Sequence, residues 1–271
     1  MPELPEVETV RAGLERLIGT EARIARIELM RPDLRVRIPP SLGRRLAGQP
    51  ITGIRRRAKF LLIDTPAGSL LCHFGMTGTW RLAPPGDERP HDHCYLHLAD
   101  HRRLAFRDPR RFGMLGLVEP HGRHPSLDGL GPEPLDAQQF TLEHLAQRCR
   151  RRKAPIKAVI MDQAVVVGVG NIYAQEALFR AGIRPQRPAG AITRARLARL
   201  VDEIRLVLAE AIVAGGSTIS DFRQAGGDSG YFQHRFRVYG RAGEACVACG
   251  ARLTGGVVGG RGTTWCRTCQ R

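Results

Sequence analysis

Short alternations of apolar and polar residues dominate the chain between residues 21 and 118. The clearest is the segment 93–98, and Leu104 and Phe106 continue the alternation after a turn. A period of two indicates strands with one buried face, and turn residues separate these segments at short intervals. We therefore expect an N-terminal β-sandwich, with the domain covering residues 1–118.

A hairpin with a cation at its tip is predicted within this region. Three arginines after Ile54 are followed by Ala58 and Lys59, and an apolar run begins at Phe60. Two strands joined by so short a connection pair with each other, so Lys59 should lie at the turn.

Helical spacing marks the start of the chain and most of its second half. At the start, one face is apolar and comprises Leu4, Val7, Val10, Leu14 and Leu17. Prolines and carboxylates near the first turn fit a helix start. After a Pro- and Gly-rich stretch, helices are expected over 136–152, 155–164 and 171–181, and a long fourth helix between Thr193 and Gly215.

These patterns divide the chain into five parts. They are the β-sandwich domain 1–118, a linker 119–134, a helical domain 135–220, a loop 221–236 and a terminal cysteine-containing module 237–271. The expected fold class is α+β with several domains.

The charge of the chain limits its possible partners. Lys and Arg number 42 against 26 Asp and Glu, giving a net charge of +16, and the isoelectric point is near 10.8. Such an excess on a folded chain indicates a polyanion, usually nucleic acid, although an arginine-rich solvated surface is the alternative. A hydrophobic content of 42% excludes a disordered basic tail.

The location of the protein is also constrained. No apolar run approaches the roughly 20 residues of a membrane span, and the N-terminus lacks the layout of a signal peptide. We therefore expect a cytoplasmic protein.

Four of the seven cysteines form two Cys-x-x-Cys pairs separated by sixteen residues: Cys246 and Cys249, then Cys266 and Cys269. This spacing predicts one structural zinc ion, because four thiolates leave no open coordination position. Two disulfides are the alternative, which a cytosolic chain disfavours.

A proline directly after the initiator methionine is the most reactive feature of the sequence. Once Met1 is removed, Pro2 is a secondary amine with a reference pKa of about 8, far below that of lysine. Attack of this amine on a sugar C1′ gives a positively charged iminium, which acidifies the C2′ proton and favours β-elimination. The adjacent Glu3 is a candidate general acid or base.

Seven motifs together resemble formamidopyrimidine-DNA glycosylase, a family of bifunctional DNA glycosylases and apurinic-site lyases. They are MPELPEVETV at residues 1–10, RRAKF at 56–60, HFGMTG at 73–78, DPRRFG at 108–113, GVGNIY at 168–173, VYGR at 238–241 and the four-cysteine module. The resemblance runs along the whole chain in the family's order. It implies a β-sandwich with a flanking helix, a helix-two-turn-helix domain and a C-terminal β-hairpin zinc finger.

The resemblance also implies catalytic roles. Pro2 is the Schiff-base nucleophile, and Glu3 transfers protons during base loss and ring opening. Lys59 is the proton donor of β-elimination and a phosphate contact. Arg261 matches the zinc-module arginine associated with δ-elimination, on a glycine-rich segment that permits a tight turn.

Further positions match the family's DNA contacts. Met76, Arg110 and Phe112 match the residues that fill the gap left by an extruded base. On the residues alone, ordinary core packing is the alternative for Met76 and Phe112.

Three more positions are implied DNA contacts: His91, Arg152 and Asn171. On the sequence alone, the two basic residues pass as exposed polar residues, and Asn171 as the cap of a glycine turn. The loop 221–236 resembles the family's lid over the extruded base.

The expected function is removal of oxidised purines from duplex DNA, followed by strand cleavage through β,δ-elimination, by a monomeric enzyme. Two alternatives remain: an endonuclease VIII-type glycosylase for oxidised pyrimidines, and a non-enzymatic zinc-containing DNA-binding protein on the same scaffold. Leu4 and the Asp108–Phe112 motif favour the purine branch.

Overall fold

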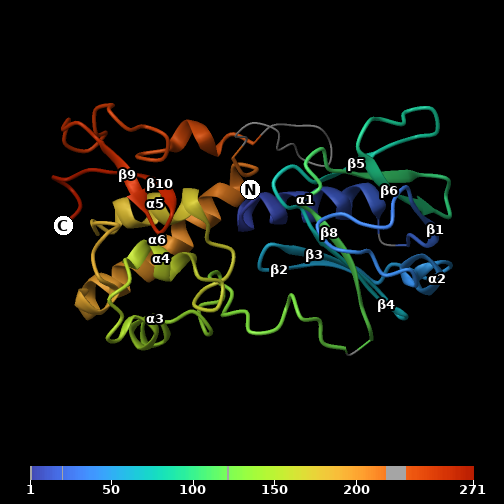
Figure 1. The fold of residues 1–271 in the computed structure, drawn as a ribbon, viewed down its shortest axis with the longest axis horizontal. Helices are drawn as coiled ribbons and strands as arrows, with labels where there is room; N and C mark the ends of the chain where they lie inside the picture. Colours follow the sequence, from blue (N-terminus) through green and yellow to red (C-terminus); the bar gives the residue numbers. More distant parts are fainter. Residues whose placement is uncertain (1, 20, 121, 218–229) are drawn as a thin grey trace. The chain divides into compact units, whose positions relative to one another are not determined.

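The structure is a computed structural model, whose fold is drawn in Figure 1. It describes residues 2–19, 21–120, 122–217 and 230–271. The contacts divide the chain into two compact units, residues 1–128 with 214–231 and residues 129–213 with 232–271. Among the described residues, no helix has the length and apolar character needed to cross a bilayer. Most of the expected lid, residues 221–229, lies outside the described residues.

The first unit contains two four-stranded antiparallel sheets within its described residues, which confirms the expected β-sandwich. One sheet has the order β1 (Ile24–Leu29), β6 (Asp92–Leu98), β7 (Arg103–Arg107) and β5 (Thr79–Leu82). The other has the order β2 (Gly53–Arg57), β3 (Phe60–Thr65), β4 (Gly68–His73) and β8 (Met114–Val118).

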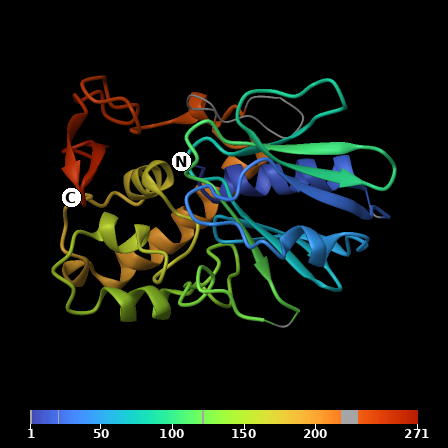
Figure 2. The same cartoon turned by 45° about the vertical axis from the view of Figure 1, so that its right-hand side comes forward.

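Two helices close the open sides of this sandwich. Helix α1 (Leu4–Ile18) contacts β2 and β5, which are edge strands of the two different sheets. Figures 1 and 2 show it in dark blue beside both sheets. Helix α2 (Leu42–Leu46) contacts β1 and β4. The core therefore combines the apolar face of α1 with the inner faces of both sheets, including the predicted Leu104 and Phe106.

The second unit is built from helices and one hairpin. It contains α3 (Leu142–Cys149), α4 (Ile156–Met161), α5 (Asn171–Arg180), α6 (Arg194–Val213), two short 3₁₀ segments (Ala189–Ala191 and Phe232–Arg235), and strands β9 (Thr254–Val258) and β10 (Arg261–Trp265). Helix α5 packs against α6 and β10, so it joins the helical part to the hairpin. Helix α6 begins directly after Thr193, as predicted.

Two helices are shorter than the sequence predicts. The expected helix 136–152 begins only at Leu142, because Asp136 accepts the N–H groups of the residues after it in a separate turn. The hydroxyl of Thr141 then accepts the N–H of His144 at 3.1 Å and caps α3. The expected helix 155–164 ends at Met161, because Asp162 is extended and its carboxylate accepts the N–H of Ala164.

Candidate functional site

The start of α1 carries the two residues at which covalent chemistry is predicted. Pro2 is buried, and Glu3, the N-cap, is 3% exposed. The N–H of Glu3 donates to Glu6 at 2.8 Å. The other carboxylate oxygen of Glu6 accepts the N–H and the hydroxyl of Ser217 at 2.8 and 2.9 Å. One buried carboxylate therefore fixes both the helix start and the segment that follows α6.

Lys59 lies at the predicted hairpin tip. Strands β2 and β3 pair up to Arg57 and Phe60, which leaves Ala58 and Lys59 as the connection. Ala58 has a φ of 55°, in the left-handed region that permits so tight a turn. Lys59 itself is only 7% exposed.

Helix α1 holds this turn in place. Glu8 accepts the Nε of Arg56 at 3.0 Å, and the same guanidinium donates to the carbonyl of Ala58 at 3.0 Å. The turn with Lys59 is thus connected by two hydrogen bonds to the helix that begins at Pro2 and Glu3.

The imidazole of His73 is a neutral group beside Lys59. His73 belongs to the motif at 73–78, but the sequence did not indicate a role for it. Its ring lies 4.9 Å from that of Phe60, its neighbour on β3. Burial, and then the charges of Lys59 and Arg35, lower the pKa of His73 to about 4. Its Nδ1 accepts the N–H of Gly75 at 3.0 Å, so the neutral ring carries its proton on Nε2.

Two neighbouring loops expose the candidate gap-filling residues. Met76 is 41% exposed and Phe112 is 44% exposed, so neither belongs to the core. The guanidinium of Arg110, also exposed, lies 4.8 Å from the centre of the Phe112 ring. The loops thus present a thioether, an aromatic ring and a cation to the surroundings.

The buried carboxylate of Asp108 holds these two loops together. It accepts the hydroxyl of Thr77 at 2.5 Å and the N–H of Gly113 at 2.7 Å. Gly75 has a φ of +59°, and an added Cβ there would lie 2.3 Å from the carbonyl carbon of Phe112. The close approach of the loops therefore requires glycine at this position.

His91 is attached to the same carboxyl-bearing residue through the backbone. Its carbonyl accepts the N–H of Asp108 at 3.0 Å, and its side chain is exposed. The positive φ of 73° is unusual for histidine.

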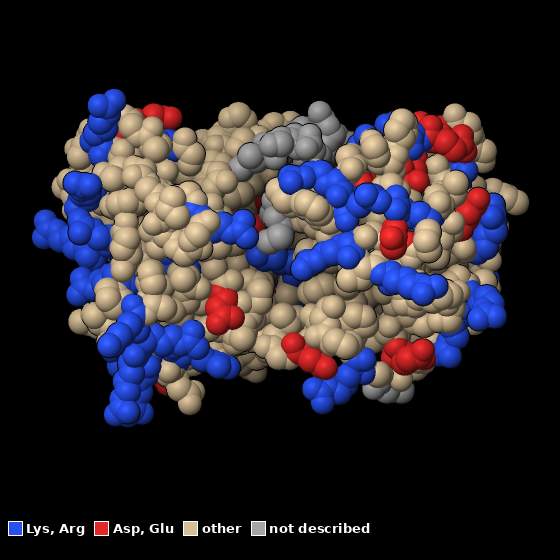
Figure 3. Space-filling view, in the orientation of Figure 1, with Lys and Arg blue, Asp and Glu red and all other residues tan. Residues whose placement is uncertain are grey.

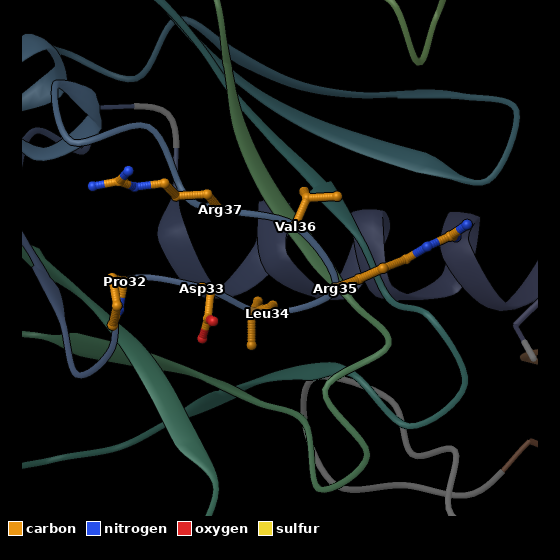
Figure 4. A pocket seen from close by; sticks show the side chains of 6 residues that line it. All are labelled: Pro32, Asp33, Leu34, Arg35, Val36 and Arg37. Carbon is orange, nitrogen blue, oxygen red and sulfur yellow. The ribbon is translucent and has the colours of Figure 1, made fainter.

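A pocket of about 290 Å³ lies on the loop 32–37 of the first unit. Figure 4 shows the side chains of Arg35 and Arg37 extending from it in opposite directions. The N–H of Arg35 donates to the carbonyl of Gly113 at 3.1 Å, which places the backbone of Arg35 beside the loop of Phe112. One short loop provides the whole lining, so we assign the pocket no ligand.

In the second unit, Asn171 is the first residue of α5 and joins three segments. Its Oδ1 accepts the ammonium of Lys157 at 2.6 Å, and its Nδ2 donates to the carbonyl of Gly262 at 3.1 Å. Lys157 is fully buried and also donates to the hydroxyl of Thr263 at 2.8 Å. The start of α5 is therefore fixed against the hairpin.

Arg261 is exposed at the start of β10, beside a pocket of about 570 Å³ that Asn171 also lines. Gly259 and Gly260, with φ of 60° and 71°, form the two-residue connection before it. Gln175 of α5 accepts the N–H of Thr264 at 2.7 Å. The predicted tight turn is thus present, and α5 supports the strand that carries Arg261.

Arg152 follows α3 and is half-buried. One of its terminal nitrogens lies 3.7 Å from a carboxylate oxygen of Asp162, a long ion pair. Arg152, Asn171, Arg261 and the cysteine module lie in the second unit, whereas the other candidate residues lie in the first.

The four cysteines form a compact cluster. Their sulfur atoms lie within 4.8 Å of one another, with 3.9 Å between Cys246 and Cys269 and 3.5 Å between Cys249 and Cys266. Metal–sulfur bonds of about 2.3 Å in a tetrahedron place sulfur atoms about 3.8 Å apart. All four cysteines are free in the structure, and the sulfur–sulfur distances exceed the roughly 2.05 Å of a disulfide bond. The cluster fits a metal ion.

Several supporting residues could not be found from the sequence. Besides Glu6 and Asp108, the fully buried Glu176 accepts the N–H groups of Arg237, Val238 and Tyr239 at 2.9–3.0 Å. The only sequence signal for such residues is a charge on a helix face or loop that is otherwise buried. Their partners are too distant along the chain to infer.

Comparisons with known proteins agree over the whole chain. Residues 1–115 match the formamidopyrimidine-DNA glycosylase N-terminal domain, and residues 130–223 match the H2TH domain of the same family. The formamidopyrimidine-DNA glycosylase of Bdellovibrio bacteriovorus is 55% identical over 271 residues, 100% of both chains. Residues 237–271 follow the H2TH match and include the cysteine cluster.

Two solved structures resemble the whole fold. The Lactococcus lactis protein, a G226P mutant in complex with DNA containing Fapy-dG, has a TM-score of 0.91 at 35% identity over 100% of both chains. A MutM protein in complex with DNA containing carbocyclic 8-oxo-G has a TM-score of 0.90 at 35% identity, again over 100% of both chains.

Proposed function

The chain belongs to the formamidopyrimidine-DNA glycosylase family, and from this premise we propose that it excises oxidised purines from duplex DNA and then cleaves the strand. The substrates are 8-oxoguanine and formamidopyrimidines, and two of its structural relatives are bound to DNA that contains carbocyclic 8-oxo-G or Fapy-dG. The reaction is that of a glycosylase and apurinic-site lyase.

The proposed chemistry begins at the nitrogen of Pro2. Its lone pair forms a bond to C1′ while the bond from C1′ to the base breaks, and Glu3 supplies protons to the departing base and opening sugar. The bond from C1′ to O4′ then breaks, O4′ takes a proton, and the Pro2 nitrogen loses its own proton, which leaves an iminium between Pro2 and C1′. The iminium withdraws electrons, so loss of the C2′ proton expels the 3′ phosphate. A second elimination expels the 5′ phosphate. Lys59 acts as proton donor in the first elimination and Arg261 assists in the second.

One observation carries this proposal: the buried start of α1 is connected to the turn of Lys59. Glu8 binds Arg56, and Arg56 binds the carbonyl of Ala58. A secondary amine, a carboxylate and a nearly buried ammonium group thus belong to one small region of the first unit. A protein that only binds DNA has no need of this combination.

Binding of the extruded nucleotide is assigned to exposed residues. Met76 and Phe112 enter the gap in the base stack, and Arg110 faces the base left without a partner. Their exposure supports this role, because a gap-filling residue must be available to the duplex. His91, Arg152 and Asn171 bind backbone phosphates.

A structural zinc ion is the metal we assign to the four cysteines. Four thiolates satisfy its tetrahedral preference and leave no position for a reacting group. The ion would fix the module that carries the hairpin of Arg261, while the lesion chemistry belongs to the protein's own side chains.

Borohydride reduction on a duplex containing 8-oxoguanine tests nucleophile, lesion and class together. The processed enzyme should give a covalent protein–DNA adduct, and Pro2→Gly should lose most of it. Pro5→Ala, in the first turn of the same helix, is the matched control and should keep it. An extension ahead of Pro2 should abolish the adduct without unfolding the protein, and Glu3→Gln should greatly slow base excision.

The same assay separates the alternatives. An endonuclease VIII-type enzyme would act on thymine glycol in preference to 8-oxoguanine, whereas a non-enzymatic binder would give no adduct on either duplex. Normal base excision by Glu3→Gln would remove Glu3 from the mechanism.

A further inference from the structure

A basic pocket lies on the helical part of the second unit, at the end of α3. Its volume is about 420 Å³, and it is lined by His144, Gln147, Arg148, Arg150 and Arg152. Figure 3 shows blue side chains gathered in the region where Figure 1 draws α3. All five lining residues have polar side chains, which suits an anion rather than an apolar ligand.

The backbone is bent so that arginines on both sides of the bend line this pocket. Arg151 has a φ of 59°, in the left-handed region. Arg150 before it and Arg152 after it both contribute to the lining, whereas Arg151 does not. The N–H of Gly190 fixes this bend by donating to the carbonyl of Arg152 at 2.9 Å.

Besides Arg152, two arginines line the pocket: Arg148 and Arg150. Among the residues that the structure describes, no ion pair includes Arg148 or Arg150, and both side chains are exposed. The nearest acidic group on the same helix, Glu143, pairs instead with Arg194 at 2.5 Å. Clustered cations that repel one another without a protein counter-ion are favoured where an external anion neutralises them.

The ring of His144 is held in place by the backbone. Its Nε2 donates to the carbonyl of Val165 at 2.7 Å, which fixes the orientation of the ring in the lining. The arginines supply the guanidinium groups of the pocket.

We propose that this pocket binds phosphodiester groups of duplex DNA outside the nucleotides at the lesion, and so lengthens the DNA footprint of the enzyme. The inference rests on the proposed function, because Arg152, which lines the pocket, is one of the expected phosphate contacts. Arg148 and Arg150 continue that contact along the backbone. Duplex DNA is favoured over a small anion because three guanidinium groups line the pocket, and successive phosphates of a strand can engage more of them than one small anion can.

Affinity measured as a function of salt tests this proposal. The full-length, zinc-loaded protein is titrated with a duplex containing an uncleavable abasic-site analogue, and the double variant Arg148→Gln/Arg150→Gln is compared with the wild type. Each lost phosphate contact makes the slope of log K against log salt shallower by about 0.9. The slope of the double variant should therefore be shallower than that of the wild type by about 1.8. Its affinity should fall about tenfold at moderate salt, because fewer counterions are released.

Duplexes shortened stepwise from each end give the second readout. Below the length that reaches the pocket, wild type and double variant should bind equally. Arg194→Gln/Arg199→Gln is the control, since it removes the same charge from α6, where both guanidiniums already have partners in this chain. It should keep the wild-type slope.

The outcomes are distinguishable. An unchanged slope in the double variant, an equal loss in the control, or a difference that persists on the shortest duplex would each overturn the inference. A role limited to the dipole of α3 would lower the melting temperature instead of the slope. If the proposed function itself is wrong, the wild type gives no borohydride adduct, whereas failure of this inference alone leaves the adduct intact.

Discussion

The backbone N–H of Glu3 donates to the carboxylate of Glu6 at 2.8 Å, one turn along the same helix. The second oxygen of that carboxylate accepts both the N–H and the hydroxyl of Ser217. Glu6 is 2% exposed, so these donors have no water to replace it. The position of the proposed proton-transfer residue therefore depends on a carboxylate that the proposed chemistry does not use.

Replacing Glu6 by Gln should impair base excision while the protein remains folded. An amide has one acceptor oxygen instead of two, so its NH₂ group faces either Glu3 or Ser217, donor against donor. An unsatisfied buried donor costs about 1–3 kcal/mol, which corresponds to a rate loss of about 5- to 150-fold where it displaces Glu3. Single-turnover excision of 8-oxoguanine measures this. Glu15→Gln, on an exposed part of α1, is the control, and equal rates for both variants would contradict the prediction.

Lys157→Met should weaken DNA binding without a loss of stability. The buried ammonium of Lys157 holds Asn171 and Thr263, and methionine fills a similar space without donating to either. The variant no longer pays the desolvation cost of a buried charge, and this gain offsets the loss of a donor to Asn171 and Thr263. The loss of one or two hydrogen bonds that orient Asn171 and the hairpin should lower affinity for an abasic-analogue duplex by about tenfold.

The control for this experiment is Lys153→Met, which removes the same charge from an exposed position four residues earlier. If both variants lose affinity equally, the effect is one of net charge. A fall in the melting temperature of Lys157→Met that matches its loss of affinity would assign it a merely structural role.

Most of the secondary structure could be predicted from local sequence patterns. Alternation over 93–98 and at Leu104 and Phe106 predicts strands because a sandwich buries one face of each strand. The apolar set, Cys94, Leu96, Leu98, Leu104 and Phe106, is indeed in the core. The expectation of only one buried face was wrong for β6, because His93 and Tyr95 on its other face are buried as well. The short connection at Ala58 and Lys59 predicts its hairpin for the same local reason. The predicted start of α3 at residue 136 was wrong, because the turn at Asp136 and the cap at Thr141 delay the helix to Leu142 despite the apolar spacing.

The supporting contacts of the site could not be predicted. Asp108 joins loops separated by some thirty residues of chain, with Thr77 on one and Gly113 on the other. Glu6 and Ser217 are 211 positions apart. Such pairs are set by how the elements pack, and neither period nor composition contains that information. The sequence alone could not exclude that Met76 and Phe112 belong to the core. Their exposure in the structure excludes it, and exposure depends on how the two loops are placed.

Removing the proposed zinc ion should abolish DNA binding but leave the first unit folded. The apolar cluster of the cysteine module is small and includes two of the cysteines themselves: Phe179, Val238, Cys246, Leu253 and Cys266. So small a core does not hold a module of this length without its ion. A strong chelator should therefore disorder the hairpin of Arg261, and added Zn²⁺ should restore binding.

Two cysteine variants sharpen this test. Cys246→Ala should lower the metal content and the affinity for DNA together. Cys149→Ala, a buried thiol of the same unit outside the cluster, should keep one metal ion per chain. Full DNA affinity in a metal-free protein would contradict the prediction.

His73 should make the first unit less stable in acid. Burial and the charges of Lys59 and Arg35 lower its pKa to about 4 in the folded protein, against 6.5 in the unfolded chain. Between these values the unfolded chain binds a proton that the folded chain does not, so stability falls as pH falls. The stabilisation is complete above pH 6.5 and is lost as pH falls through about 4. A difference of this size is on the order of 3 kcal/mol.

His73→Asn isolates this contribution, because its Oδ1 can still accept the N–H of Gly75 but does not titrate. Melting temperatures of both proteins are measured from pH 7 to pH 4 on metal-loaded samples, and the difference between them is followed. The wild type should lose stability more steeply below pH 6.5 than His73→Asn. His101 is an exposed histidine of the same unit, and the control variant His101→Asn should follow the wild type. Parallel curves for wild type and His73→Asn would mean that His73 is protonated as readily in the fold as outside it. Its assignment as a neutral donor beside Lys59 would then be wrong.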